Sequence, residues 1–227
     1  QGSRRLLAGS APHREGAMAV YRIPAAGGVG LGSFLARNPY LSNLSLRSSP
    51  DLLTEKGLAG LSSGLGDAEL PRLRSLDLDN CDIQPGAAHR LGRLFAKCPA
   101  LEELRLWSNP GLMTAEGLDG LKQGLGGACL PALTRLHLGS CDIQASAAES
   151  LGTLLARSSQ LQILSLSLNR FLLTNEGIAG LERGLGGVEL SELRELLVYR
   201  TFNTKSLTAK AALLQRIGAS SECVVRA

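Results

Sequence analysis

Leucine recurs along this chain at regularly spaced positions, and the spacing itself repeats. Six segments open with Leu-x-x-Leu-x-Leu or a close variant of it, at Leu41, Leu73, Leu101, Leu133, Leu161 and Leu193. The interval between openings alternates between 32 and 28 residues, so two intervals make one block of 60 residues. Residues 101–160 match residues 41–100 at 30 of 60 positions without a gap. Such self-similarity at a fixed period is the signature of stacked repeats that bury one continuous core.

Each opening segment predicts a short strand. Leu104 and Leu106 alternate with polar side chains, which is the period of two that a pleated strand requires. We expect both leucines, and their counterparts Leu136 and Leu138 in the next half, to point into the core. The residues between them should then face outward.

A turn and an amphipathic helix follow each strand. Thr114 can cap a helix in which Leu118, Leu121 and Leu125 recur at intervals of three and four residues. Equivalent threonines precede the corresponding helices of the other two blocks, at Thr54 and Thr174. In the shorter halves, the helix after Ile83 is predicted to bury its alanines and leucines.

The two ends of the chain depart from the repeat. Residues 1–12 show no periodicity, and we predict a flexible arm there. Residues 13–227 are predicted to form one repeat domain, with degenerate capping repeats at 13–40 and 193–227. In the first cap, residues 21–23 align with residues 81–83. In the second, Thr201 and Asn203 replace the repeat's Cys and Ile.

The tail after residue 206 predicts a final helix. Ala211, Leu214 and Ile217 keep a helical spacing, and Cys223-Val-Val follows them. We expect this atypical helix to shield the leucines of the last layer.

The alternation of the two halves resembles the ribonuclease-inhibitor-like class of leucine-rich repeats. The resemblance is carried by residues 73–83 and 133–143, which share the form Leu-x-x-Leu-x-Leu-x-x-Cys-x-Ile, and by Asn109 and Asn169 at the equivalent position of the longer halves. It implies an α/β horseshoe with parallel strands on the concave face and helices on the convex face. The longer halves depart from the usual pattern by extra residues such as Pro110-Gly111, so their turns are expected to bulge.

Charge is unevenly distributed along the chain. Residues 41–200 hold 15 basic and 18 acidic side chains, whereas residues 1–40 hold five against one and residues 201–227 hold four against one. A nucleic-acid-binding protein would be expected to carry a basic stripe on its folded face, because phosphate neutralisation supplies most of the affinity. The repeats are mildly acidic, so we expect no nucleic-acid partner.

Five cysteines, an odd number, do not suggest a disulfide framework. We therefore expect an intracellular, reducing compartment, with the cytoplasm first and an organelle stroma or matrix second. The acid-free opening of residues 1–10 is compatible with the tail of a transit peptide, although a disordered terminus is the favoured interpretation. The apolar runs are far shorter than the ~20 residues that span a bilayer.

Glycine-rich stretches raise the alternative of a phosphate-binding loop. Residues 27–32, Gly-Gly-Val-Gly-Leu-Gly, lack the Lys-Ser/Thr of a Walker loop and do not fit the G-x-G-x-x-G spacing. Residues 124–127, Gly-Leu-Gly-Gly, recur at 64–66 and 184–187, and we interpret them as a repeated helix terminator. No cofactor is expected.

Catalytic and metal-binding patterns are not readable in the sequence. The three histidines are well separated, and no Cys-x-x-Cys or His-x-x-x-His pair occurs. Cys81 and Cys141 are each followed by Asp, but a buried turn cysteine explains both better than a reactive thiol. We predict that the chain is not an enzyme, has no metal site and takes no small-molecule substrate.

The outward residues of the strands form the candidate binding surface. Trp107 is the only tryptophan, and beside it on a solvated face should lie Arg105, Arg135 and His137. An aromatic side chain among charges is typical of a protein-binding hot spot. The alternative is that Trp107 covers a neighbouring residue and that the charges are a solvated sheet. The predicted partner-binding residues of the concave face are Arg47, Asp77, Asp79, Glu103, Arg105, Trp107, Arg135, His137 and Tyr199.

Two functions remain open at this point. The first is a non-enzymatic scaffold that binds a partner protein through the concave face. The second is an accessory structural subunit that docks into a larger complex through its edges and basic termini. One form of this hypothesis places the complex in an organelle. Gly117, Gly120 and Gly124 lie at three- and four-residue spacing, which favours close packing of neighbouring helices over a docking surface on the convex side.

Overall fold

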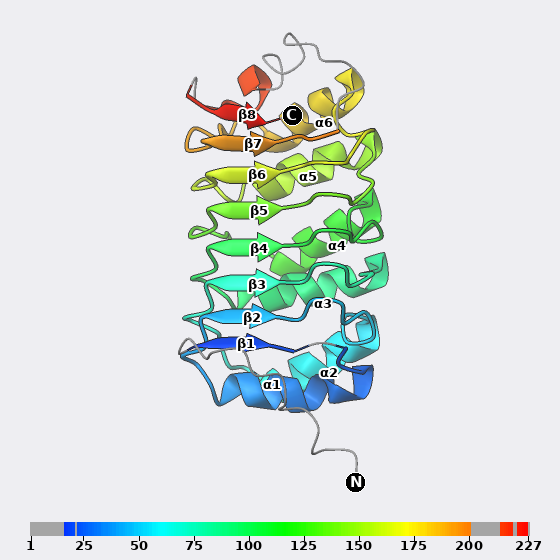
Figure 1. Ribbon diagram of the computed structural model, residues 1–227, viewed down its shortest axis with the longest axis vertical. Helices are drawn as coiled ribbons and strands as arrows, with labels where there is room; N and C mark the ends of the chain where they lie inside the picture. The colour runs from blue at the N-terminus through cyan, green and yellow to red at the C-terminus, as the bar shows by residue number, and fades with distance from the viewer. Residues whose placement is uncertain (1–15, 21, 201–213, 220–221, 227) are drawn as a thin grey trace.

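The computed structural model describes residues 16–20, 22–200, 214–219 and 222–226. Its described residues form one sheet of eight parallel strands in the order β1 to β8 (Figure 1). The strands are β1 (Ala17–Ala19), β2 (Asn43–Ser45), β3 (Ser75–Asp77), β4 (Glu103–Arg105), β5 (Arg135–His137), β6 (Ile163–Ser165), β7 (Glu195–Leu197) and β8 (Val224–Arg226). Each strand is the direct sequence neighbour of the next, so the sheet has no crossover between distant repeats.

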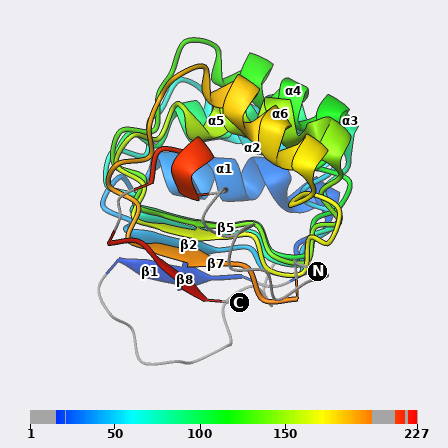
Figure 2. The same ribbon diagram turned by 90° about the horizontal axis from the view of Figure 1, so that it is seen from above.

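The helices all lie on one side of this sheet (Figure 2). They are η1 (Ala25–Gly27), α1 (Gly28–Ala36), α2 (Glu55–Leu65), α3 (Pro85–Ala96), α4 (Ala115–Leu125), η2 (Ala145–Ala147), α5 (Ala148–Leu155) and α6 (Asn175–Leu185). This is the predicted leucine-rich-repeat horseshoe, with strands on the concave face and helices on the convex face. The predicted fold class is confirmed.

Leucines pair with leucines from strand to strand. Leu76 of β3 aligns with Leu104 of β4, and Leu104 aligns with Leu136 of β5. Leu104, Leu106, Leu136 and Leu138 are all buried, as their alternation predicted. Because the side-chain period of a strand is two, this register leaves the intervening residues on the opposite face.

A buried asparagine satisfies the backbone where the chain leaves the strand. The side chain of Asn109 donates to the carbonyl oxygens of Leu78 (2.9 Å) and Leu106 (3.0 Å). Its Oδ1 accepts from the backbone N–H of Cys81 (3.1 Å) and of Ile83 (3.3 Å). One side chain therefore ties two consecutive repeats together inside the core, where unpaired backbone groups would be costly.

Cysteine occupies the equivalent place in the shorter halves. The Cys81 thiol donates to the Leu46 carbonyl oxygen (3.3 Å), and burial raises its pKa to about 11. Burial likewise raises the pKa of Cys141 to about 11, and its thiol donates to the carbonyl oxygen of Leu106 (3.2 Å). Both thiols thus stay protonated and serve as internal donors, so the interpretation as buried turn cysteines is confirmed.

Each longer half begins its helix at a threonine. The side chains of Thr54, Thr114 and Thr174 accept a hydrogen bond from the backbone N–H three residues later. The extra residues before Thr114 form a turn that buries Leu112 and Met113. The longer halves therefore use their additional length to fill the core.

Glycines bring the helices into contact in pairs: α1 with α2, α3 with α4 and α5 with α6. A Cβ on Gly124 of α4 would lie 2.0 Å from the carbonyl oxygen of His89 in α3, and one on Gly120 would lie 3.0 Å from the Cβ of Ala88. The packing expected from these two glycines is confirmed. Gly117 differs, since it packs against the carbonyl oxygen of Leu112 in its own preceding turn.

The interpretation of the Gly-Leu-Gly motif as a helix terminator is only half right. Gly66 and Gly126 follow the last helical residue and have positive φ, which ends the helix. Gly64 and Gly124 are the last but one residues of their helices and permit close helix–helix contact instead. A helix can therefore approach its neighbour and stop within three residues.

The glycine-rich segment near the N-terminus is a helix and not a loop. Residues 28–32 lie in α1, and a Cβ on Gly32 would lie 2.1 Å from the carbonyl oxygen of Leu61 in α2. Ile23 is buried, and Arg22 shares a positive φ with Asp82. These features support the predicted alignment of the first cap with the shorter halves.

The C-terminal end closes with a strand that the sequence analysis did not predict. Residues 214–216 are helical and Ile217 is buried, as expected, but Val224–Arg226 then form β8 and pair with β7. The expected helix is present, and backbone pairing with β8 covers the edge of β7 in addition. The predicted arm at 1–12, and Thr201, Asn203, Leu207 and Ala211, lie outside the described residues.

Replacing the buried asparagine should be costly. Asn109→Ala removes the hydrogen-bond partner of two N–H groups and of the Leu78 carbonyl oxygen inside the core, and it leaves the Leu106 carbonyl oxygen with only the Cys141 thiol. We expect the free energy of unfolding to fall by about 3 kcal/mol or more, measured by urea denaturation. The matched control is Asn43→Ala on the exposed part of β2, which should change the stability by less than about 0.5 kcal/mol. Equal effects would contradict the role assigned to Asn109.

Two glycine-to-alanine changes should have opposite signs. Gly124→Ala forces a methyl group against the backbone of α3, so we expect a loss of about 2 kcal/mol in thermal or urea unfolding. Gly86→Ala, in α3, places its methyl group in open space and should stabilise the chain by roughly 0.5 kcal/mol. A neutral Gly124→Ala variant would show that α3 and α4 are not held in contact.

Candidate protein-binding surface

The outward side chains of the sheet form three columns that run across the strands. Ser45, Asp77, Arg105, His137 and Ser165 follow one another in the middle column, as the strand register requires. Parallel strands lie ~4.8 Å apart, so neighbours in a column can touch. The columns on either side begin at Asn43 and at Arg47.

Asp79 is the centre of an ion-pair cluster. Its Oδ2 accepts hydrogen bonds from Nε and one terminal nitrogen of Arg105, both at 3.3 Å, and lies 4.0 Å from Arg47. Its Oδ1 accepts from the backbone N–H of Trp107 at 2.8 Å. The Asp79 side chain is only 4% exposed, so it lies on the outer face as predicted but is covered by its neighbours.

Asp77 supports this cluster through hydrogen bonds. It accepts from the backbone N–H of Asp79 (3.0 Å) and from the hydroxyl of Ser45 (3.1 Å). Asp77 is thus a support for the neighbouring acid and no arginine is paired with it in the described part of the chain.

Glu103 organises the adjacent part of the surface. Its carboxylate lies 3.8 Å from both Arg105 and Arg135, and it accepts from the Ser75 hydroxyl at 3.4 Å. His137 Nε2 lies 3.5 Å from the same carboxylate. Glu103 therefore connects β3, β4 and β5 through side chains alone.

His137 has one unsatisfied ring nitrogen. Its Nε2 is buried and has no hydrogen-bond partner among the described residues, although Glu103 is near. Burial lowers the pKa of His137, and Arg105 and Arg135 lower it further, whereas Glu103 and Asp79 act in the opposite direction. The imidazole is therefore held neutral at its place in the middle column.

Trp107 packs against the next strand. A Cβ at Gly139 would lie 2.1 Å from the six-membered ring of Trp107, so the indole occupies the space that the missing side chain leaves. Its backbone N–H is fixed by Asp79. The alternative interpretation, that Trp107 covers a neighbour, is thus correct in part, yet the residue stays half-buried and not fully covered.

The structure brings together eight of the nine predicted residues and leaves one apart. Tyr199 is exposed beyond the end of β7, three strands away from Trp107. Sequence reasoning also missed that Ser165 and Ser167 are buried and that Ile163 and Leu197 make the surface over β6 and β7 more apolar. The alternation with leucines predicts on which side of the sheet these residues lie, but the neighbouring side chains decide how deeply each one is buried.

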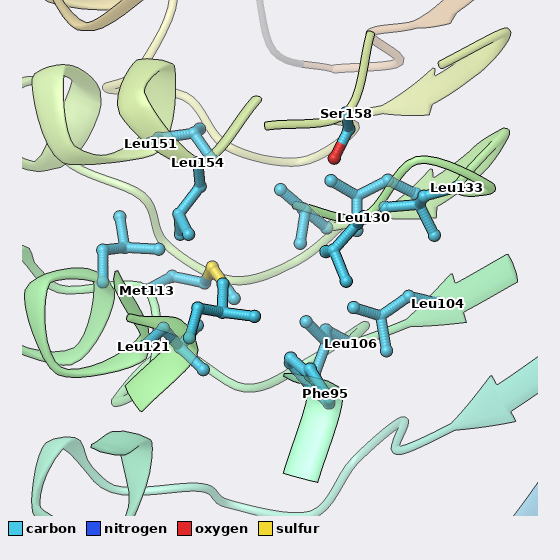
Figure 3. Close-up of a pocket in the computed structure, with 14 residues that line it drawn as sticks. Phe95, Leu104, Leu106, Met113, Leu121, Leu130, Leu133, Leu151, Leu154 and Ser158 are labelled. Carbon is cyan, nitrogen blue, oxygen red and sulfur yellow. The ribbon is translucent and has the colours of Figure 1, made fainter. Parts of the chain in front are cut away.

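A small internal cavity of about 40 Å³ lies under this surface (Figure 3). Leu104, Leu106 and Leu133 line it from the sheet side, and Met113, Leu121 and Leu151 line it from the helix side. Ser158 is the polar residue at its edge. Its walls are apolar and it is no larger than a few methyl groups, so it is a packing defect of the core and not a ligand site.

Among the described residues, no group of three or more metal-ligating side chains is gathered in one place. None of the helices in the same part of the chain has the length and apolarity to cross a membrane.

Comparison with known proteins points to one kind of repeat. The family described as Leucine Rich repeat matches residues 130–152, which run from the loop before β5 into α5. The chain is also similar to a protein from Sus scrofa named ribonuclease inhibitor, with 34% identity over 142 residues. The matched region covers 61% of this chain and 29% of that protein, so it spans less than a third of the relative's length.

The ring of His137 should titrate below its ordinary pKa of ~6.5. The unfolded chain then binds more protons than the folded one near pH 6, so the contribution of this residue to stability is lost as the pH falls through ~6.5. NMR titration of the imidazole gives the midpoint. Urea unfolding at about pH 7.5 and 5.5 should show a smaller pH dependence for His137→Gln than for the unchanged chain. A midpoint at or above the ordinary value would contradict the burial argument.

Proposed function

We propose that this chain, which is similar in part to a ribonuclease inhibitor and carries leucine-rich repeats, is a non-enzymatic binding module that holds a partner protein on its concave face. The observation that carries the proposal is the fixed position of Trp107 on that face, against Gly139 and above Asp79. A large aromatic side chain that is already ordered loses little entropy when a partner covers it.

The charged residues around Trp107 divide into two roles. Arg47 and Arg135 expose about half of their side chains and can touch a partner. Asp79 and Glu103 lie deeper and hold the arginines, and Asp77 supports Asp79. This combination of a central aromatic side chain and a polar surround is typical of hot spots in protein interfaces.

A ribonuclease is one candidate partner. The support is the similarity to the Sus scrofa ribonuclease inhibitor, which is confined to part of that protein. Fold and repeat type alone do not fix a partner. A ribonuclease is therefore tested as one candidate in the experiment below, and the concave-face proposal does not depend on it.

The second candidate function is a subunit docked through an end of the solenoid. It is favoured by the apolar side chains exposed at the N-terminal layer, Val29, Phe34 and Tyr40. Tyr40 also stacks with Arg72, 5.3 Å from the ring centre. The basic termini of this hypothesis lie mainly outside the described residues.

We place the protein in a reducing compartment. All five cysteines are free, and four of them are buried. Of the reducing compartments, we prefer the cytoplasm over an organelle interior. Free thiols that serve as internal hydrogen-bond donors would be lost on oxidation.

The test compares concave and convex variants in partner capture. Trp107→Ala and Arg135→Ala should together weaken binding by about 2 kcal/mol or more, close to a thirtyfold rise in Kd. Proteins retained by the immobilised chain are quantified by mass spectrometry, and a purified ribonuclease is assayed separately by calorimetry. Arg105→Ala is avoided because it would leave the buried Asp79 with only the hydrogen bond from the Trp107 backbone N–H.

The matched controls are Phe171→Ala and Arg93→Ala, an exposed aromatic and an exposed arginine away from the concave face. They should bind as the unchanged chain does. If the controls lose the partner and the concave variants keep it, the concave-face proposal is wrong. Loss on Tyr40→Ala alone would favour docking through the N-terminal end.

A further inference from the structure

The concave face has no net formal charge, but its arginines are more exposed to solvent than its acids. Its outward positions from β2 to β8 hold four arginines and four acids. The arginines are Arg47, Arg105, Arg135 and Arg226, and the acids are Asp77, Asp79, Glu103 and Glu195. Counting charges would therefore predict no preference for either sign of partner.

In each arginine–carboxylate pair of this face among the described residues, the arginine is the more exposed partner. Arg47 and Arg105 expose 53% and 41% of their side chains, against 4% for Asp79. Arg135 exposes 43%, against 21% for Glu103. An approaching molecule meets guanidinium groups first, because the acids lie beneath them.

The ion pairs of the helical side do not share this order. Glu55 is more exposed than its partner Arg90, and Glu149 is as exposed as Arg183. The outward projection of arginine is thus a property of the sheet face and not of ion pairs throughout the molecule. The strands carry small residues and short acidic side chains, so the longer arginine side chains extend past them toward solvent.

Two of these arginines have guanidinium N–H groups that make no hydrogen bond within the described part of the chain. Arg105 is held by two hydrogen bonds to Asp79. Arg47 and Arg135 have only contacts of 4.0 and 3.8 Å to Asp79 and Glu103, and no side-chain hydrogen bond within the described part of the chain. A guanidinium group offers five N–H donors in a geometry that suits a carboxylate.

The three arginines lie on a diagonal across the face. Arg47 follows β2 in the outermost column, Arg105 is in the middle column of β4, and Arg135 is in the opposite column of β5. Trp107 lies beside this diagonal and offers an apolar surface. An extended segment with alternating acidic and apolar residues would meet both features.

We infer that the concave face binds an acidic protein segment, in which Asp or Glu carboxylates contact Arg47 and Arg135 and an apolar side chain packs on Trp107. This inference rests on the proposed function and names the chemistry of its partner. A basic segment is disfavoured because arginines cover the acids. A nucleic acid is disfavoured because no arginine stands on β6 or β7, where the outward positions include Ile163 and Leu197, so the basic residues form no continuous stripe.

The test uses Trp107, the only tryptophan of the chain, as its own reporter. The full chain is titrated with a dodecapeptide that alternates Glu with Leu and Ser, and the fluorescence of Trp107 is followed. We expect a saturable change with a midpoint below ~1 mM. Matched peptides with Lys or Gln in place of Glu should give a much weaker response.

Charge reversal then locates the contact. Arg47→Glu with Arg135→Glu should raise the Kd for the acidic peptide by at least ~30-fold, and the milder pair Arg47→Gln with Arg135→Gln by ~10-fold. Arg93→Glu with Arg90→Glu, on the convex face, should leave the Kd within about twofold, because these side chains are beyond the ~8 Å range of screened charges. Circular dichroism and urea unfolding confirm that each variant is folded.

Three results would overturn the inference: no saturable response to the acidic peptide, a stronger response to the Lys peptide, or a stronger response to a single-stranded oligonucleotide. Each differs from a failure of the proposed function. If Trp107→Ala abolishes capture of a protein partner while the reversal of Arg47 and Arg135 does not, the concave face binds proteins but not through carboxylates.

Discussion

The structure depends on the parallel register of its leucines. Leu44, Leu76, Leu104 and Leu136 align from strand to strand, and each buries its side chain between the sheet and the helices. Apolar burial of this kind contributes roughly 1.5–3 kcal/mol for each leucine. A slip of one residue would turn a whole row of leucines to solvent, so the register is fixed strongly. The same register decides which residues form the outer columns.

The alternation of longer and shorter halves adds a second level of order. Asparagine ties the backbone in the longer halves, as at Asn109, and a protonated cysteine does so in the shorter ones, as at Cys81. Glycine brings the helix of each shorter half against the helix that follows it, as Gly124 does for α4 against α3. The 60-residue block is therefore the physical unit of the solenoid, which explains why sequence identity is high at that period.

The binding surface follows from these constraints and from what the strands carry. Small residues such as Gly139 give Trp107 a place to lie, and the buried Asp79 fixes its backbone. The acids sit low because their side chains are short, and the arginines reach over them because theirs are long. A face with zero formal charge can thus present one sign of charge to a partner, since depth and number are independent properties.

The sequence by itself determined the repeat, the strand and helix positions, the inward leucines and the threonine caps, because each depends on local spacing that the chain carries in order. It also placed Arg105, Trp107, Arg135 and His137 on one face. Only the tertiary structure decided that Asp79 is buried, that Tyr199 lies apart, that Gly64 packs helices and that β8 closes the sheet. These features depend on contacts between residues about 30 or more positions apart in the chain, where the size and direction of the neighbouring side chain, and not the spacing of the pattern, set the outcome.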